Sequence, residues 1–402
     1  MGYNSFAFLS DNYIFISTGL LIIFSILINW IVNFNIKNKN IKLIIKLGIL
    51  LRIVIIIIDN YFQIISFGGA DGKVFHLNGW LGLNNFPYWD ISFIKSVVVP
   101  SYKLLGEAVP IFIVLLNFLG YTLAIIYLYK SMNLINEKKS KRKFLLFLII
   151  SFSLVSALLN VSLLREGIML FFTTFSIYCY MKKEKVYMIL SVISISISAY
   201  FHSGMVFIIF GYIYNFVMKQ KGQKKFFYII FGIVLLILIV LIIFNLPYFK
   251  GRDLESLSKK AIEDAGSKYA SEVSSSAEYI LTSPIRLFYF LFSPTPNMFR
   301  GIRDIISFLL NSCIYIFFIY DSIKNYNRIR KKINIEEKIF IQSLVISFFV
   351  TAYAYAMGTT TAGTALRHRD KLLFLLALIN FYVYSKKERI VRIRKYQRRK
   401  NV

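Results

Sequence analysis

The sequence predicts an all-α membrane protein: one polytopic bundle of about eleven transmembrane helices, with the N-terminus outside and the basic C-terminus in the cytoplasm. Three observations predict this fold class. Of the 402 residues, 57% are hydrophobic and the mean hydropathy is +0.62, which leaves too little polar surface for a soluble domain of this size. The hydrophobic residues occur in long blocks. Segments rich in Lys and Arg alternate with these blocks.

The hydrophobic blocks are close to the length of about 20 residues that a helix needs to cross a bilayer. The expected spans are residues 13–34, 43–60, 108–129, 144–164, 166–181, 186–201, 204–218, 226–246, 302–322, 339–358 and 370–385. The first block is full-length and no basic segment precedes it. We therefore interpret it as a true span and not as a cleavable signal peptide.

Every second connection between these spans is dense in Lys and Arg. The basic segments are 35–42, 130–143, 182–185, 219–225, 324–338 and 386–402. Basic connections stay in the cytoplasm, so an odd number of spans and a cytoplasmic tail explain the alternation. The net charge of +28 thus follows mostly from topology and attracts anionic lipid headgroups. No nucleic-acid-binding module accompanies the charge, which argues against a nucleic-acid partner.

Two connections on the predicted outer side are long. The first outer loop, residues 61–107, contains the glycine-rich segment GGADGKVFHLNGW. The second outer loop, residues 247–301, opens with a polar stretch, in which residues 254–270 are expected to form an amphipathic surface helix. It continues as SPIRLFYFLFSPTPNMFRG, an apolar run that is short and bounded by prolines. This run predicts an interfacial or re-entrant helix.

Arginine on the outer side is the informative feature, because the topology does not require positive charge there. The arginines in question are Arg165, Arg286, Arg300, Arg303, Arg367 and Arg369. Ionisable residues in or beside spans are costly and often functional. Arginine stays charged and binds phosphate with two parallel hydrogen bonds. These residues therefore predict a phosphate site, and contacts with lipid headgroups are the alternative.

Acid and base candidates accompany the arginines. Asp71 and His76 lie in the glycine-rich outer segment, where glycines let the backbone approach a ligand closely. His202 follows an apolar span, and His368 and Asp370 belong to the basic cluster that begins the last span. A carboxylate or an imidazole can deprotonate a sugar hydroxyl. The residues alone do not rank Asp71, His202 and His368.

Arg165 and Glu166 form the short turn between two predicted spans, in NVSLLREGIML. A structural ion pair is the alternative to a functional role for these two residues. Cys179 and Cys313 lie inside apolar spans and have no metal-ligand spacing. No motif of nucleotide or metal chemistry occurs, so we expect neither a metal nor a cofactor.

Four segments of the chain resemble the EpsG/Wzy-type polysaccharide polymerases. They are GGADGKVFH, LLREGIML with the later AYFHSGMVF, SPIRLFYFLFSPTPN, and GTALRHRDK. Glu166 departs from the resemblance, because a neutral residue is expected after that arginine. The resemblance implies a GT-C-like integral-membrane glycosyltransferase of the bacterial cytoplasmic membrane. It would join oligosaccharide repeat units carried on undecaprenyl pyrophosphate at the outer face, without a metal.

The candidate residues take their roles from this reaction. The pyrophosphate-binding candidates are Arg165, Arg286, Arg300, Arg367 and Arg369, and the catalytic candidates are Asp71, His202, His368 and Arg165. Further candidates are His76, Glu166, Arg303 and Asp370. Arginines at the headgroup level can stabilise charge on the leaving phosphate. Expected partners are the lipid-linked oligosaccharide, membrane lipids and a chain-length regulator.

Two alternatives stay open at this point. A flippase for lipid-linked oligosaccharides should carry charge along the depth of its bundle, whereas here the charges cluster on the outer side apart from Lys46 and Arg52. An O-antigen-type ligase or a surface-glycan acyltransferase would act on the same side. A ligase would share the basic pocket and differ from a polymerase only in its acceptor.

Overall fold

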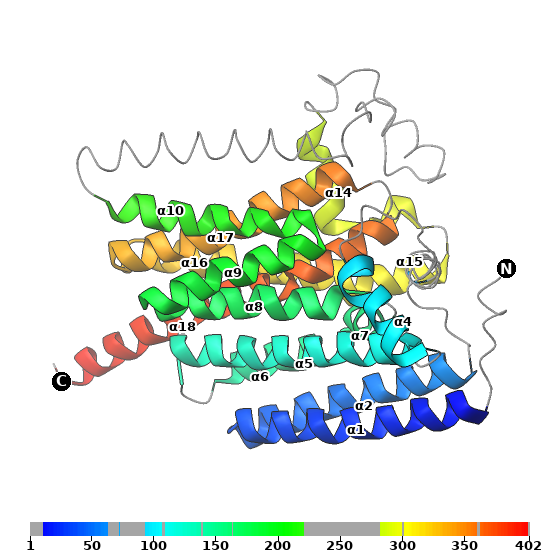
Figure 1. Ribbon diagram of the computed structural model, residues 1–402. Helices are drawn as coiled ribbons and strands as arrows, with labels where there is room; N and C mark the ends of the chain where they lie inside the picture. Colours follow the sequence, from blue (N-terminus) through cyan, green and yellow to red (C-terminus); the bar gives the residue numbers. More distant parts are fainter. Residues whose placement is uncertain are drawn as a thin grey trace. The chain divides into compact units, whose positions relative to one another are not determined.

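The computed structural model describes residues 11–62, 72, 93–106, 109–137, 140–162, 164–220, 282–299, 301–359 and 362–400. These residues are 90% helical and contain no strand, which confirms the all-α prediction (Figure 1). The chain divides into two compact units, which we call unit 1 (Met1–Ser203) and unit 2 (Gly204–Val402). Each unit is described by itself. The single continuous domain stays a prediction.

Unit 1 consists of packed helices. Its elements are α1 (Asp11–Asn35), α2 (Lys39–Phe62), the π-helix η3 (Ile94–Val98), α4 (Val99–Leu105), α5 (Val109–Ile135), α6 (Lys141–Phe152), α7 (Leu154–Asn160), α8 (Glu166–Lys182) and α9 (Lys185–Phe201). α8 lies between α5 and α9 in the packing (Figure 1). A Cβ atom added to Gly167 would lie 2.0 Å from the Asn117 carbonyl oxygen, and one added to Gly120 would lie 2.6 Å from the Ile168 nitrogen. Glycine thus allows α5 and α8 the close approach that is typical of membrane helix pairs.

Hydroxyl groups join the antiparallel helices α8 and α9. The Ser176 hydroxyl donates to the Ser191 carbonyl oxygen at 2.8 Å, and the Thr173 and Ser198 hydroxyl oxygens lie 2.9 Å apart. All four side chains are buried. Hydrogen bonds of this kind hold helices together where both the helices and their surroundings are apolar.

Unit 2 contains the remaining described elements. They are the 3₁₀-helix η5 (Ser203–Ile208, whose first residue closes unit 1), α10 (Ile209–Lys219), α14 (Ser283–Phe292), the 3₁₀-helix η6 (Pro296–Met298), α15 (Ile302–Ser307), the π-helix η7 (Phe308–Ser312), α16 (Cys313–Ile329), α17 (Ile335–Gly358) and α18 (Ala362–Lys400). α17 packs against α10, α14 and α18. A Cβ atom on Gly211 would lie 2.1 Å from the Ser343 carbonyl oxygen, so α10 and α17 also require glycine at their contact.

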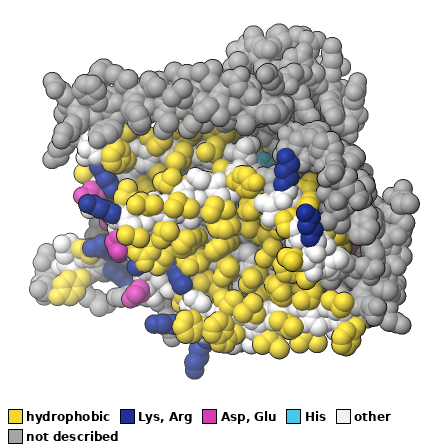
Figure 2. Space-filling model, in the orientation of Figure 1, with side chains coloured by type: hydrophobic (Ala, Val, Ile, Leu, Met, Phe, Trp, Pro, Cys, Tyr) yellow, Lys and Arg dark blue, Asp and Glu magenta, His cyan; other side chains and the backbone are white. Residues whose placement is uncertain are grey.

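Several helices are long and apolar enough to span a membrane, as expected for a multi-pass membrane protein. Among the described residues they are Ile14–Asn35, Val109–Ile135, Asp304–Ile329 and Ile335–Gly358, and the bent pair α6–α7 makes up to five. On the visible face, hydrophobic side chains cover most of the described surface (Figure 2). Phe15 on α1, for example, is 82% exposed, as suits a lipid-facing residue. The count of eleven spans and the orientation stay predictions.

Individual predicted elements differ in their outcome. The expected span at 144–164 is not one continuous helix, because α6 ends at Phe152 and α7 continues at an angle of 54°. The last predicted span and the basic tail form one helix that runs to Lys400. The short helix expected in SPIRLFYFLF is α14, which has Pro284 in its first turn and ends before Pro294. The span expected at 226–246 and the surface helix expected at 254–270 lie outside the described residues.

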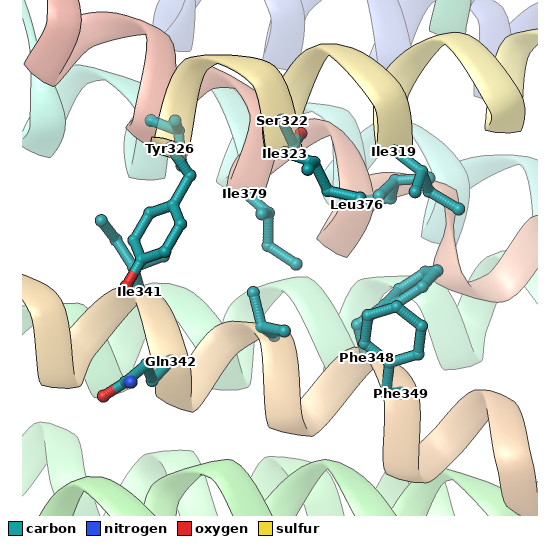
Figure 3. A pocket seen from close by; sticks show the side chains of 12 residues that line it. Ile319, Ser322, Ile323, Tyr326, Ile341, Gln342, Phe348, Phe349, Leu376 and Ile379 are labelled. Atoms are coloured by element: carbon teal, nitrogen blue, oxygen red, sulfur yellow. The ribbon is translucent and has the colours of Figure 1, made fainter. Parts of the chain in front are cut away.

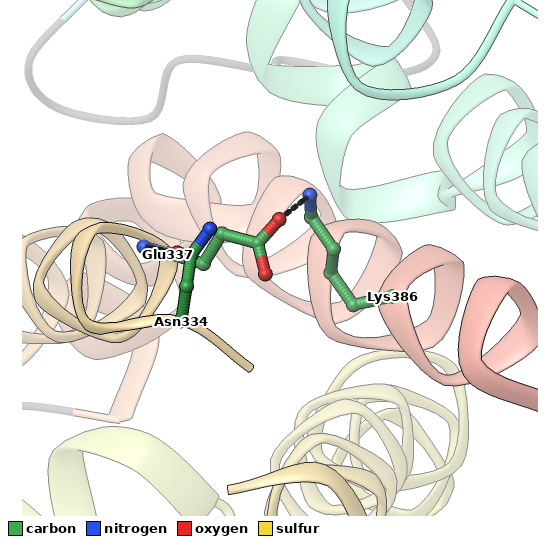
Figure 4. A network of polar contacts seen from close by, with 3 residues as sticks. All are labelled: Asn334, Glu337 and Lys386. Atoms are coloured by element: carbon green, nitrogen blue, oxygen red, sulfur yellow. Dashed lines mark hydrogen bonds and ion pairs between the residues drawn. The ribbon is translucent and has the colours of Figure 1, made fainter. Parts of the chain in front are cut away.

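Asn334 caps the N-terminus of α17, and Figure 4 shows its place beside Glu337 and Lys386. The Asn334 side-chain oxygen accepts a hydrogen bond from the Glu337 backbone N–H at 2.8 Å. Lys386 of α18 donates to the Glu337 carboxylate. We expect Asn334→Ala to lower the free energy of unfolding by about 1 kcal/mol, since a helix N-terminal N–H loses its acceptor. Thermal unfolding of the detergent-solubilised protein measures this, with Asn334→Asp as the control that should stay near wild type.

Candidate functional site

The first group of candidate residues lies where α8 begins. Arg165 is the N-cap residue of α8, and Glu166 is the first residue of the helix. The Glu166 side chain is 1% exposed, and its Oε2 accepts a hydrogen bond from the Arg165 backbone N–H at 3.0 Å. A carboxylate in the first turn also interacts favourably with the helix dipole. This contact gives Glu166 a structural role at the start of α8.

His202 lies at the same end of the α8–α9 pair as Arg165. It is the C-cap residue of α9, and its backbone N–H donates to the Ser198 carbonyl oxygen at 3.1 Å. The Ser198 hydroxyl in turn donates to the Met169 carbonyl oxygen, one turn into α8. Because the two helices are antiparallel, the end of α9 lies beside the beginning of α8. Unit 1 therefore brings together two of the candidates, Arg165 and His202, at one helical end.

Asn117 holds this end of unit 1 together, and the sequence analysis did not select it. Its side chain is fully buried on α5, and its Oδ1 accepts from the Gly167 backbone N–H at 2.5 Å. Its Nδ2 donates to the carbonyl oxygens of Leu159 at 3.1 Å and Ser162 at 3.3 Å. One amide thus joins α5, the end of α7 and the start of α8. An Asn inside an apolar span is the signal that could have identified it.

Arg52 is a second buried polar residue of unit 1 with a structural explanation. Its side chain is 1% exposed, and its Nη1 donates to the carbonyl oxygens of Gly48 at 3.0 Å and Ser151 at 2.7 Å. Its guanidinium lies 3.9 Å from the centre of the Tyr121 ring, and the Tyr121 hydroxyl donates to the Ile150 carbonyl oxygen. Both acceptor carbonyls on α6 lie just before the break. Arg52 and Tyr121 therefore each donate a hydrogen bond to a carbonyl group at the end of α6, where the helix bends.

Arg369 in unit 2, like Arg52 in unit 1, is a buried arginine that donates hydrogen bonds to backbone carbonyls at a helix end. Its side chain is 0% exposed, and its guanidinium lies 5.1 Å from the centre of the Tyr315 ring. Its Nη atoms donate to the carbonyl oxygens of Leu291 at 2.6 Å, Ser293 at 2.8 Å and Phe290 at 3.3 Å. These are the last carbonyls of α14 and the residue after it, where a positive charge also complements the helix dipole. This geometry makes Arg369 a C-terminal cap of α14, and its binding of pyrophosphate stays a prediction.

The candidate His368 lies with other side chains around the buried Tyr355 ring of α17. The His368 ring stacks on it, with centroids 4.8 Å apart and an angle of 18° between the planes. Phe290 of α14 is also nearly parallel to Tyr355, at 6.3 Å and 15°. Lys371 lies with its Nζ 5.3 Å from the Tyr355 centroid and 3.0 Å from His368 Nδ1. Gly204 completes the contact, since a Cβ there would lie 2.7 Å from the Tyr355 ring.

Arg286 and Arg367 are two further candidate arginines near this ring cluster in the sequence. Arg286 lies one turn before Phe290, so the two share a face of α14. Arg286 is buried, and its Nε lies 3.4 Å from the Thr282 hydroxyl oxygen. Arg367 precedes the predicted last span and is half-buried. Burial lowers the pKa of the Arg367 guanidinium to about 10, so the side chain is still a cation at neutral pH.

The remaining candidates are Asp71, His76, Arg300, Arg303 and Asp370. Asp71, His76 and Arg300 lie outside the described residues. Arg303 belongs to α15, and its side chain is outside the described part. Asp370 is buried beside Arg369 and Lys371 on α18. Within the described ranges, no group of three or more His, Cys, Asp or Glu residues has a geometry that could hold a metal.

An apolar cavity of about 240 Å³ lies between α16, α17 and α18 (Figure 3). Its lining residues are Ile319, Ser322, Ile323, Tyr326, Ile341, Gln342, Val345, Phe348, Phe349, Leu376, Ile379 and Val383. None of them is an acid, a histidine or a cation. The cavity has the chemistry of a site for a hydrocarbon chain and carries no group for acid/base catalysis.

Comparison with protein-family models, with curated proteins and with solved structures finds no match to this chain.

Proposed function

We propose that this protein is an integral-membrane glycosyltransferase that polymerises oligosaccharide repeat units carried on undecaprenyl pyrophosphate. The reaction takes place at the outer face of the bacterial cytoplasmic membrane, in the synthesis of capsule, exopolysaccharide or O-antigen. The chain has a GT-C-like bundle of about eleven spans, an outer N-terminus and a cytoplasmic tail. Its partners are the lipid-linked substrate, membrane lipids and a chain-length regulator.

The observation that carries the proposal is the contact of Lys371 and His368 with the Tyr355 ring, beside basic residues on α14 and α18. The cation Lys371 and the His368 ring contact the buried Tyr355 ring, and Arg367 directly precedes His368 on α18. Arg286 occupies the face of α14 that also bears Phe290. Cationic groups held in a partly buried setting attract an anion more strongly than they would in water. A pyrophosphate that leaves with at least two negative charges is a suitable ligand for them.

The chemistry assigns roles to the candidate residues. The acceptor hydroxyl attacks the anomeric carbon of the donor sugar, the bond between that carbon and the pyrophosphate oxygen breaks, and the electron pair leaves with the pyrophosphate. Arg286 and Arg367 of unit 2 stabilise the charge of the pyrophosphate. A base accepts the proton of the hydroxyl, and Asp71, His202 and His368 are the candidates.

The buried arginines bear on the flippase alternative. Arg52 is the charge deepest in a predicted span, and a charge lining a transport path would favour a flippase. However, Arg52 donates to the Ser151 carbonyl oxygen beside the bend between α6 and α7. A structural role therefore accounts for this charge. Because Arg52 has this structural role, it does not support a transport path, and we favour an enzyme that acts at one face of the membrane over a flippase.

Deletion of the gene tests the proposal. We expect the mutant strain to make glycans of a single repeat unit in place of long chains, and the plasmid-borne gene to restore them. Gel electrophoresis of labelled surface glycan measures the chain length. Long chains of normal length in the mutant would refute the polymerase proposal. Precursor retained on the cytoplasmic leaflet would indicate a flippase instead, and transfer only to a non-repeat acceptor by the purified protein would indicate a ligase.

A further inference from the structure

His368 and Lys371 form a hydrogen-bonded couple at the start of α18. They are three residues apart, which places them on one face of the helix. Lys371 Nζ lies 3.0 Å from His368 Nδ1, and the Lys371 side chain is 1% exposed. Both side chains also contact the Tyr355 ring, the histidine by stacking and the lysine as a cation over the ring. The Tyr355 ring and the His368 imidazole thus hold the Lys371 ammonium group in place.

The donor in this hydrogen bond follows from elementary chemistry. An ammonium group has three N–H donors and no acceptor, so a protonated Lys371 can only donate to Nδ1. The face of Tyr355 stabilises a cation on Lys371 as well.

The surrounding charges oppose a second proton on His368. Lys371 Nζ lies at hydrogen-bond distance from its Nδ1, and Arg367 and Arg369 flank His368 in the sequence of α18. Like charges disfavour the charged form of a titratable group. A neutral imidazole whose Nδ1 accepts a hydrogen bond must carry its proton on Nε2.

We propose that Lys371 is a positioning residue that holds His368 as the neutral tautomer with its proton on Nε2. In this form His368 donates a hydrogen bond to a phosphate oxygen of the lipid carrier and does not act as the general base. The choice of phosphate as the acceptor rests on the proposed function, whereas the tautomer does not. The proton of the attacking sugar hydroxyl then passes to a base other than His368.

Nitrogen NMR of histidine tests the tautomer directly. The chain has three histidines, so ¹⁵N-histidine-labelled protein in liposomes gives three imidazole signal pairs, and His368→Gln assigns the relevant one. We expect an unprotonated Nδ1 and a protonated Nε2 at pH 7. A proton on Nδ1, with or without one on Nε2, would overturn the proposal. This measurement uses the wild-type protein, so it stands even if a variant fails to fold.

Two lysine variants separate the positioning role from general stability. We expect Lys371→Met to abolish the tautomer preference and produce a mixture of both neutral forms. Lys387→Met is the matched control, because Lys387 is on the same helix and also donates a hydrogen bond, at 2.8 Å to Asn325 Oδ1. It should leave the His368 signals unchanged. An unchanged tautomer in folded Lys371→Met protein would contradict the positioning role.

A soluble analogue of the lipid carrier tests the donor role. We expect farnesyl pyrophosphate to shift the protonated Nε2 signal of His368, and farnesol, which lacks the phosphates, to leave it in place. An Nε2 signal that neither compound moves would overturn the donor role. Chain length in the deletion strain is measured separately, so failure of the polymerase proposal and failure of this one give different results.

Discussion

Replacing Arg367 with Gln is expected to lower the polymerisation rate by about 100- to 1,000-fold, the effect of removing one donor that stabilises transition-state charge. Arg367 is half-buried next to the stacked His368 and keeps its positive charge at neutral pH. Glutamine keeps part of the length and polarity and removes the charge. The readout is the length of glycan chains made by the purified variant in liposomes that contain the lipid-linked repeat unit.

The control for this experiment lies on the same helix. Arg392 is exposed on α18 and forms an ion pair with Glu388 at 3.5 Å, so Arg392→Gln should polymerise at the wild-type rate. Arg367→Lys should be intermediate, because it keeps the charge and loses the two parallel hydrogen bonds. Chains of normal length from folded Arg367→Gln protein would contradict a role for Arg367 in binding pyrophosphate.

Replacing Arg369 with Met is expected to destabilise the fold by about 3–5 kcal/mol. Arg369 donates to three backbone carbonyls at the end of α14 and to the Ser312 hydroxyl oxygen, and its side chain is fully buried. Methionine fills similar space and donates nothing, so these acceptors lose their partner away from water. The apparent melting temperature of the detergent-solubilised protein, followed by size-exclusion chromatography, measures the loss.

An arginine on the surface provides the comparison. Arg330 is exposed after the end of α16, and Arg330→Met should melt close to wild type. If Arg369→Met protein melts at the wild-type temperature and loses polymerisation, the capping role is wrong and a ligand role is favoured. The two arginine experiments therefore distinguish residues that lie only two positions apart.

Arg367 and Arg369 have the same residue type and nearly the same position, and yet they lie on different faces of α18. Both belong to one short basic cluster, and the sequence analysis assigned both to pyrophosphate. Residues two positions apart on a helix point about 200° away from each other, so one faces the end of α14 and the other does not. The sequence gives the charges and the helical period. It does not show that Arg369 contacts the C-terminal end of α14.

The buried polar residues of unit 1 show the same limit. Asn117 and Arg52 lie inside apolar segments, and this is visible in the sequence. Their partners are the carbonyls of Leu159 and Ser151, which come from distant positions and are exposed by the end of α7 and the bend after α6. The bend has a local signal in Ser153, the N-cap of α7, whose side chain accepts a hydrogen bond from the Ser156 backbone N–H at 3.4 Å. The distant partners have no such signal.

The sequence by itself determined that this protein is helical and apolar, and it located the basic clusters, because hydrophobic block length and charge are properties of each segment alone. Only the tertiary structure decided which cations cap helices and which surround Tyr355. That division depends on where carbonyl groups are left without helical partners, and such groups arise when helices from distant parts of the chain end or bend against one another.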